Sequence, residues 1–446
     1  SKDAAYKAIT AGSDMDMESN AYRNNLAQLV KENKISIDIV DDAVRRILRK
    51  KFELGLFDNP FRYSDIERQK AQMNNPEHTK IARVVAAKSI VLLKNEKGIL
   101  PLSKDLKTIA FIGPMVKPKR ANHGFWAIDV KEIDSSYIVS QWEGLINKIG
   151  KKSKLLYAKG CGINNDDKSG FKEAIDIASQ SDVVIVSIGE RHDMSGEAKS
   201  RSTINIPGVQ EELVKELQKT GKPIVVLINA GRPLVFNWLA DNMPTIVYTW
   251  WLGSEAGNAI ADVLFGDYNP SGKLPMTFPR SEGQIPLYYN HFNTGRPSMN
   301  DNDIIYKSTY IDSPNTPKFP FGYGLSYTSF QYADLKLSKS AISKNEQIVV
   351  TMNLTNTGKY DGAEVVQLYI KDKFGSVVRP VKELKDFQKV FLKAGETKNI
   401  TFTIDNSKLS FYNDKLVFDS ESGEFELMIG TSSEDIRLNA NFELID

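Results

Sequence analysis

Cysteine and histidine are scarce in this sequence of 446 residues, which contains one cysteine, Cys161, and four widely spaced histidines. A single cysteine cannot form an internal disulfide, and the histidines lack the spacing of a metal-ligand set. No predicted strand is followed by a G-x-G-x-x-G or Walker pattern, so nucleotide binding has no support either. We therefore expect no disulfide, no metal site and no cofactor.

Strong charge and long apolar runs are also lacking. The net charge is +2 and the lysines are scattered, so we expect no nucleic-acid partner and no membrane partner. No apolar run approaches the roughly 20 residues of a membrane span, and no signal peptide stands at residue 1. Because Ser1 is not a methionine and a helical pattern begins at once, we expect this chain to start inside a longer protein.

The first part of the chain predicts three helices, with turns near 13–17 and 34–36. Ser36 suits the N-cap of the third helix and Gly55 its end, with apolar residues at helical spacing between them. About 55 residues with so little strand could not bury enough surface to form a secure domain alone. A polar stretch, 59–76, then predicts an extended surface connector, followed by a helix over 77–93 whose more buried side includes Ile81, Val84 and Val85.

The middle of the chain alternates short β-branched runs with helical patterns. The runs lie at 108–112, 183–188, 224–228 and 245–249, and the helical patterns at 171–178, 209–218 and 255–265. Such alternation predicts an α/β domain with a mainly parallel sheet.

The last part changes to alternating strands, at 347–354, 363–371, 398–404 and 425–429. About seven short strands in this length indicate a fibronectin-type or immunoglobulin-like sandwich. The expected domains are therefore a helical segment 1–58, a linker 59–76, an α/β domain 77–297, a connector 298–329 and a β-sandwich 330–446.

One loop gathers most of the candidate chemistry. The β-branched run that ends at Ile188 is followed by Glu190, His192, Asp193, Glu197, Lys199 and Arg201. Ligands of open α/β sheets bind beyond the carboxyl ends of the strands, so this loop is where we expect a functional site. His192 and Asp193 are more typical of hydrogen-bonding loop residues than of catalytic ones.

Several long segments resemble the bacterial β-glucosidases of glycoside hydrolase family 3. They are AGSDMDM at 11–17, AVRRILRKKFELGLFDNP at 43–60, ARVVAAKSIVLLKNEKGILPL at 82–102, GDYNPSGKLPMTFPRSEGQIPLYYNHFNTGRP at 266–297, FPFGYGLSYTSF at 319–330 and TNTGKYDGAEVVQLYI at 355–370. The resemblance covers essentially the whole chain. It implies a TIM-like barrel, an α/β sandwich domain and a fibronectin-III-like domain, with residues 1–58 as the last helices of the barrel.

The resemblance also implies two catalytic carboxylates, of which this chain carries one. The family's nucleophile is an aspartate in a Ser-Asp-Trp or Ser-Asp-His motif of the barrel, and no such motif stands here. Asp14 and Asp16 lie in a motif downstream of the nucleophile and outside that role. The family's acid/base glutamate comes from a motif that SGEAKSR at 195–201 matches, which makes Glu197 the candidate.

Chemistry agrees with this choice, because a retaining glycosidase needs one carboxyl that donates a proton and later accepts one. The positive charges of Lys199 and Arg201 would lower the pKa of Glu197 if they pointed at it, whereas a general acid must keep its proton. We therefore expect them to pair elsewhere, with Glu190 or Asp193. Without the family, Glu197 reads as a solvated loop carboxylate, and Glu190 is the alternative acid/base.

Trp126, in the loop KPKRANHGFWAID at 117–129, is the candidate substrate-binding residue. Relatives often present an aromatic ring here toward the active-site mouth, where it would stack on a leaving-side sugar. The alternative is a ring packed beneath its own loop. Trp250 and Trp251 are expected in the core.

The resemblance implies a retaining exo-β-glucosidase that removes terminal β-D-glucosyl residues from short oligosaccharides or aryl β-glucosides. This chain alone is expected to be inactive and to need the missing N-terminal barrel segment as its partner. A β-xylosidase of the same family and a non-catalytic carbohydrate-binding or scaffold relative are the alternatives. The family implies a periplasmic or secreted protein, and a homodimer stays open.

Overall fold

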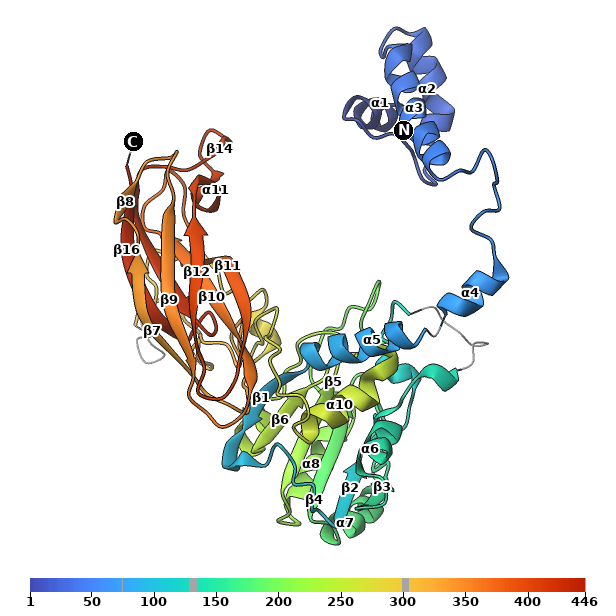
Figure 1. The fold of residues 1–446 in the computed structure, drawn as a ribbon, viewed down its shortest axis with the longest axis vertical. Helices are drawn as coiled ribbons and strands as arrows, with labels where there is room; N and C mark the ends of the chain where they lie inside the picture. Colours follow the sequence, from blue (N-terminus) through green and yellow to red (C-terminus); the bar gives the residue numbers. More distant parts are fainter. Residues whose placement is uncertain (74, 128–134, 299–304, 446) are drawn as a thin grey trace. The chain divides into compact units, whose positions relative to one another are not determined.

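The computed structural model describes residues 1–73, 75–127, 135–298 and 305–445, and the chain divides into two compact units, Ser1–Asn75 and Pro76–Asp446 (Figure 1). Part of the expected connector 298–329 and the last two residues of the loop 117–129 lie outside the described residues. Among the described residues, no helix is both long and apolar enough to cross a membrane.

The first unit is helical. Its helices are α1 (Lys2–Thr10), α2 (Ala21–Lys31), α3 (Ile37–Glu53) and α4 (Ile66–Gln72). The Ser36 hydroxyl caps α3 by accepting from the Asp38 N–H, as predicted. The short helix α4 occupies part of the stretch expected to be extended, because the Asp65 carboxylate caps its first turn. The core of this unit is small, and Met17 and Phe61 remain 83% and 74% exposed.

The second unit begins with a helix and a strand where the sequence predicts one long helix. Helix α5 (Pro76–Ser89) ends before β1 (Val91–Asn95), so the expected helix over 77–93 is wrong in its last turn. Val91 and Leu93 face one apolar core and Leu92 faces the other, which is the two-residue period of a strand. Helix α5 buries Ala86 and Ala87, whereas the side expected to be buried, that of Ile81, Val84 and Val85, is exposed.

A six-stranded sheet forms the centre of this part, in the order β1-β6-β5-β4-β2-β3. Strand β1 is antiparallel to β6 and the other neighbours are parallel, which confirms the mainly parallel sheet. The remaining strands are β2 (Thr108–Ile112), β3 (Lys154–Ala158), β4 (Val183–Gly189), β5 (Ile224–Asn229) and β6 (Thr245–Tyr248).

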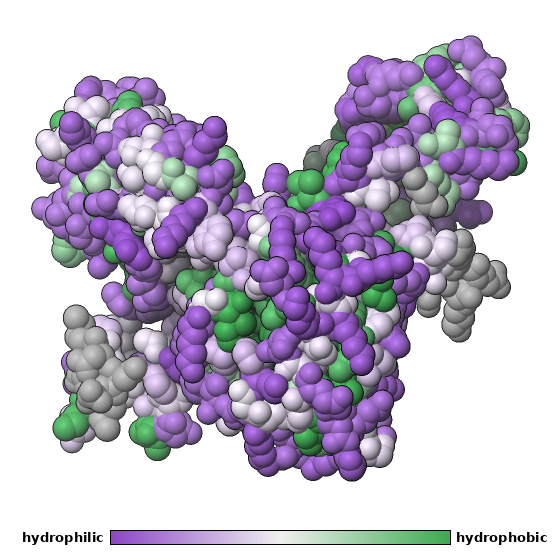
Figure 2. All heavy atoms as spheres, turned by 60° about the horizontal axis from the view of Figure 1, so that its bottom comes forward, coloured by the Kyte–Doolittle hydropathy of each residue, from purple (hydrophilic) through white to green (hydrophobic). Residues whose placement is uncertain are grey.

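Helices cover both faces of the sheet. One core contains residues of α7 (Phe171–Ser179), α8 (Gln210–Gln218) and α9 (Asn237–Asn242). The other contains residues of α5, α6 (Gln141–Ile149) and α10 (Ala256–Leu264). Burial on both faces explains why the central strands are almost continuously apolar and rich in β-branched residues rather than alternating. Outside, hydrophilic side chains cover most of the face that Figure 2 shows.

A β-sandwich ends the chain, as predicted. One sheet has the order β11-β10-β15-β16-β8, a second has β12-β9-β7, and β13 and β14 form a hairpin. Buried and partly exposed residues alternate along β9, so one of its faces lines the core. The elements are β7 (Phe330–Leu337), β8 (Ala341–Ile342), β9 (Ile348–Asn356), β10 (Gly362–Asp372), β11 (Glu383–Leu392), β12 (Thr397–Ile404), α11 (Asn406–Leu409), β13 (Phe411–Tyr412), β14 (Phe418–Asp419), β15 (Gly423–Gly430) and β16 (Ile436–Leu444).

Candidate active site

The carboxyl ends of two adjacent parallel strands meet at the loop that the sequence singles out. Strand β4 ends at Gly189 and continues into Glu190, while β5 continues into the turn that carries Arg232. Gly189 has φ +136°, and a β-carbon there would lie 1.9 Å from the carbonyl oxygen of Asn229. Only glycine therefore allows the chain to leave the sheet at this point.

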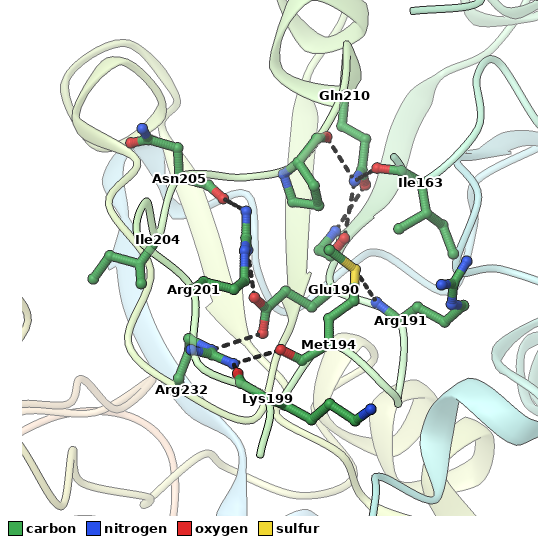
Figure 3. Close-up of polar contacts among 12 residues, drawn as sticks. Ile163, Glu190, Arg191, Met194, Lys199, Arg201, Ile204, Asn205, Gln210 and Arg232 are labelled. Carbon is green, nitrogen blue, oxygen red and sulfur yellow. Dashed lines mark hydrogen bonds and ion pairs between the residues drawn. The ribbon is translucent and has the colours of Figure 1, made fainter. Parts of the chain in front are cut away.

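Glu190 is a buried anion between two arginines. Its side chain is 0% exposed, and its carboxylate accepts from Arg201 Nη1 through one oxygen and from Arg232 Nε, 3.3 Å away, through the other (Figure 3). A fully buried carboxylate is tolerated only when it is paired in this way. Both of its oxygens accept from arginines and the side chain is buried, contacts that suit a structural anion better than an acid/base.

Arg232 also holds the backbone of the loop after β4. Its Nη2 donates to the carbonyl oxygens of Met194 and of Lys199, the latter at 2.7 Å (Figure 3). The backbone of Arg232 is itself held, because the buried Tyr248 hydroxyl donates to its carbonyl oxygen at 2.5 Å. The pKa of Tyr248 is raised by burial and by the nearby Glu190 charge, so this hydroxyl keeps its proton.

Glu197 lies on the exposed part of this loop. The residues on either side have left-handed backbones, with φ +147° at Gly196 and φ +55° at Ala198. A left-handed alanine is unusual and persists only where surrounding contacts impose it. The loop therefore presents Glu197 to solvent in a defined, strained turn.

The loop of Trp126 contacts the loop of Glu197. Gly196 lies against the ring of Phe125, and the Lys199 ammonium is 5.7 Å from the centre of the same ring. Phe125 and Trp126 pack edge to face with centroids 5.3 Å apart. The Trp126 side chain is 76% exposed, so it is not packed beneath its own loop. The structure thus brings the two predicted site residues onto touching loops.

The ends of the Glu197 loop are closed by one buried amide. Gln210 is 0% exposed, and its Oε1 accepts from the Gly189 N–H at 2.8 Å. Its Nε2 donates to the carbonyl oxygens of Gly189, Pro207 and Ile163 at 2.8–3.0 Å (Figure 3). The residue before the loop and the residue near its end are therefore bound to the same side chain.

Of the two basic residues beside Glu197, Arg201 pairs elsewhere as expected, whereas the Lys199 ammonium lies near the Phe125 ring rather than beside Glu190 or Asp193. Arg201 pairs with Glu190 rather than with Glu197. Asp193 pairs with Arg191, whose guanidinium lowers the pKa of this carboxyl.

The two aspartates of AGSDMDM have structural contacts in the first unit. Arg46 binds Asp14 through two nitrogens and lowers its pKa, and Asp16 accepts from the Ser19 hydroxyl and the Tyr22 N–H.

Arg232 is the site residue that the sequence does not reveal. Its turn, NAGRP, has the composition of an ordinary loop. The one sequence feature that indicates a functional role for Arg232 is its position just after a buried parallel strand. Trp250 and Trp251 are partly rather than fully buried, and the Trp251 ring lies against Gly124 and Gly231. Within the described residues, no cluster of three or more His, Cys, Asp or Glu side chains could hold a metal ion.

Comparison with known proteins places this arrangement in a family. Residues 90–327 match the Glycosyl hydrolase family 3 C-terminal domain, and residues 364–433 match a Fibronectin type III-like domain. The chain is 41% identical to a periplasmic beta-glucosidase of Salmonella typhimurium, over 100% of this chain and 60% of the relative. It is 40% identical to a beta-xylosidase of Formosa agariphila, over 97% and 60%.

Solved structures agree with the sequence matches. The beta-glucosidase from Listeria innocua, determined in complex with isofagomine, superposes with a TM-score of 0.90 at 36% identity, covering 99% of this chain and 61% of that one. The chain thus spans about 60% of the length of the relatives it matches. On the family match over residues 90–327 and these relatives, the chain belongs to glycoside hydrolase family 3.

Proposed function

We propose that this chain forms the α/β and fibronectin-III-like part of a retaining exo-β-glucosidase that removes terminal β-D-glucosyl residues from short oligosaccharides. The observation that carries the proposal is the exposed Glu197 in a loop whose ends are pinned at the carboxyl edge of the sheet. A carboxyl that is exposed yet held in place is suited to meeting a substrate bound by another part of the protein. The relatives named beta-glucosidase support glucose as the sugar that is released.

In this proposal Glu197 is the general acid/base. It protonates the departing glycosidic oxygen and then deprotonates the water that releases the sugar, as retaining glycosidases require. Trp126 binds the leaving-side sugar by stacking its exposed ring on the apolar face of the pyranose.

The nucleophile belongs to a segment that this sequence does not contain. A retaining mechanism needs two carboxyl groups about 5–5.5 Å apart, and the family's nucleophile motif is absent from residues 1–446. We propose an N-terminal barrel segment of roughly 250–300 residues as the source. Residues 1–58 would be its last helices, followed by a linker 59–76, an α/β domain 77–297, a connector 298–329 and a β-sandwich 330–446.

The proposal is tested by comparing this chain with the full-length protein on aryl β-glucosides, after the intact mass of each has been measured. We expect no hydrolysis by a chain of 50.0 kDa and activity in the full-length protein. There Glu197→Ala should abolish hydrolysis of poor leaving groups, and azide should restore part of the activity on activated ones. Hydrolysis by this chain alone, or a fully active Glu197→Ala variant, would contradict the proposal.

A β-xylosidase is the second candidate, because relatives named beta-xylosidase and beta-glucosidase match almost equally well, at 40% and 41% identity. The ratio of kcat/KM for aryl β-xylosides and aryl β-glucosides decides between them. The Salmonella relative named periplasmic supports a periplasmic or secreted location, which cell fractionation tests. A homodimer is tested by light scattering of the full-length protein.

A further inference from the structure

We propose that Arg232, oriented by Glu190, is a positioning residue that sets the place of the Glu197 carboxyl. This inference rests on the proposed acid/base role of Glu197. Arg232 touches neither Glu197 nor, in the proposed mechanism, the sugar. It acts through the backbone of the loop that carries Glu197, here called the acid loop and defined as residues 194–199.

The contacts of Arg232 bracket the acid loop. One guanidinium nitrogen, Nη2, donates to the carbonyl oxygens of Met194 and Lys199, which are the first and last residues of the loop. A single rigid group therefore fixes the distance between the two ends. Because Glu197 lies between them, any movement of either carbonyl changes where its carboxyl points.

The backbone of the acid loop needs such support. Gly196 and Ala198 both have positive φ, and alanine disfavours this conformation. Strained residues of this kind persist only when neighbouring groups over-determine them. The Arg232 contacts supply that constraint at the two ends of the loop, while the ring of Phe125 covers Gly196 from the neighbouring loop.

Glu190 gives Arg232 its orientation. The Arg232 side chain is 19% exposed, and its Nε donates to the fully buried Glu190 carboxylate. The other carboxylate oxygen accepts from Arg201, whose Nη2 also donates to the carbonyl oxygen of Asn205 at 3.3 Å. The planar guanidinium allows the carboxylate and the two loop carbonyls to be bound at once, which the point charge of a lysine cannot reproduce.

The test uses the full-length protein and the variants Arg232→Gln and Arg232→Lys. A poor leaving group, such as the second glucose of a disaccharide, needs protonation by the acid, whereas a 2,4-dinitrophenolate does not. We expect kcat/KM for the disaccharide to fall by about 10²-fold, the usual effect of displacing a catalytic group by about 1 Å. The glycosylation rate with the dinitrophenyl β-glucoside should change little.

Arg280→Gln is the matched control, because Arg280 is also partly buried and donates through Nε to a loop carbonyl, that of Thr316, at 2.8 Å. This variant should hydrolyse both substrates at the wild-type rates. Should Arg232→Gln fail to fold, Arg232→Lys keeps the charge opposite Glu190 and carries the test. Melting temperatures identify variants that are merely unfolded.

The outcomes separate this inference from the proposed function. An equal loss on both substrates, or no loss on either, would overturn the positioning role of Arg232. A Glu197→Ala variant without dependence on the leaving group would overturn the acid/base role, and the positioning role would fall with it. If Glu197→Ala shows that dependence and the folded Arg232 variants do not, only the positioning role is wrong.

Discussion

Gly196 and Phe125 are in such close contact that a β-carbon on Gly196 would lie 2.3 Å from Cγ of the phenylalanine ring. This contact joins the acid loop to the loop that carries Trp126. A side chain at position 196 would have to push one loop away from the other. The spacing between the two candidate site residues therefore depends on a glycine that has no chemistry of its own.

Gly196→Ala should separate the two loops and lower kcat/KM of the full-length protein by about 10²-fold, as expected for a displacement of about 1 Å. Gly221→Ala is a matched control, because Gly221 also has positive φ, +71°, but a β-carbon there would have no atom of the described residues within 4 Å beyond its chain neighbours. The control should lose some stability through backbone strain and keep its activity. Equal activity of the two variants would contradict the predicted dependence of activity on this contact.

Trp126→Ala should weaken binding of the leaving-side sugar without unfolding the protein, because the ring is 76% exposed. A stacking contact worth about 0.5–1.5 kcal/mol corresponds to a roughly 2- to 10-fold fall in kcat/KM for a disaccharide. Trp126→Phe keeps a flat apolar ring and should retain most of the activity. The measurement is steady-state kinetics on the full-length protein, and an unchanged Trp126→Ala variant would refute the stacking role.

Asp262→Asn should destabilise the second unit at neutral pH. Asp262, on α10, is 14% exposed and binds Arg83 of α5 and Lys148 of α6 at 2.6–2.8 Å. Burial raises the pKa of this carboxyl, but the hydrogen bonds from Arg83 and Lys148 outweigh burial and lower it overall. The loss should be about 1.5–3 kcal/mol in the free energy of unfolding, as for other hydrogen bonds to charged groups.

The pH dependence of this effect follows from the lowered pKa. The stabilisation by Asp262 is complete above the unfolded value of about 4 and is lost as the pH falls through the lower folded value. Urea unfolding should therefore separate the wild type from Asp262→Asn at pH 7 and bring them together in acid. Asp176→Asn removes an exposed pair with Lys172 and should change little at either pH. A difference that grows in acid would contradict the assignment.

Cys161 should react slowly with thiol reagents in the native protein. It is 5% exposed, and burial raises its pKa to about 11, so almost no thiolate is present at pH 8. Because it is the only cysteine of the chain, the coloured thiolate that an aromatic disulfide reagent releases reports on this site alone. Unfolding in urea should restore one rapidly reacting thiol per chain, and rapid reaction of the native protein would contradict the burial.

The elements that could be predicted from the sequence are those that can be recognised from their own residues alone. The central strands β2, β4, β5 and β6 are apolar and rich in β-branched residues because both faces are buried, and each is found where predicted. Strands β1 and β3 are the two edges of the sheet. Strand β1 follows a helix without a break in the apolar pattern, and β3 is only partly buried. Neither strand therefore differs enough from its surroundings to be predicted from the sequence.

The candidate site divides in the same way. The pairing of Arg201 with Glu190 could be expected because the two residues lie on one loop. Arg232 could not, because its partner Glu190 is 42 residues away and their proximity is created by parallel pairing of β4 and β5. The contact between Arg232 and Glu190 therefore becomes evident only once the pairing of the strands is known.

Gln210 has a further consequence for how this loop can be changed. One amide group joins Gly189, where the loop leaves the sheet, to Pro207, just before α8 begins. The segment between them is therefore closed at its base by one side chain. Segments from relatives that keep the buried Glu190, its partner Arg201 and the core residue Ile206 should therefore be exchangeable here, so that directed evolution could vary leaving-group preference while the sheet beneath stays folded.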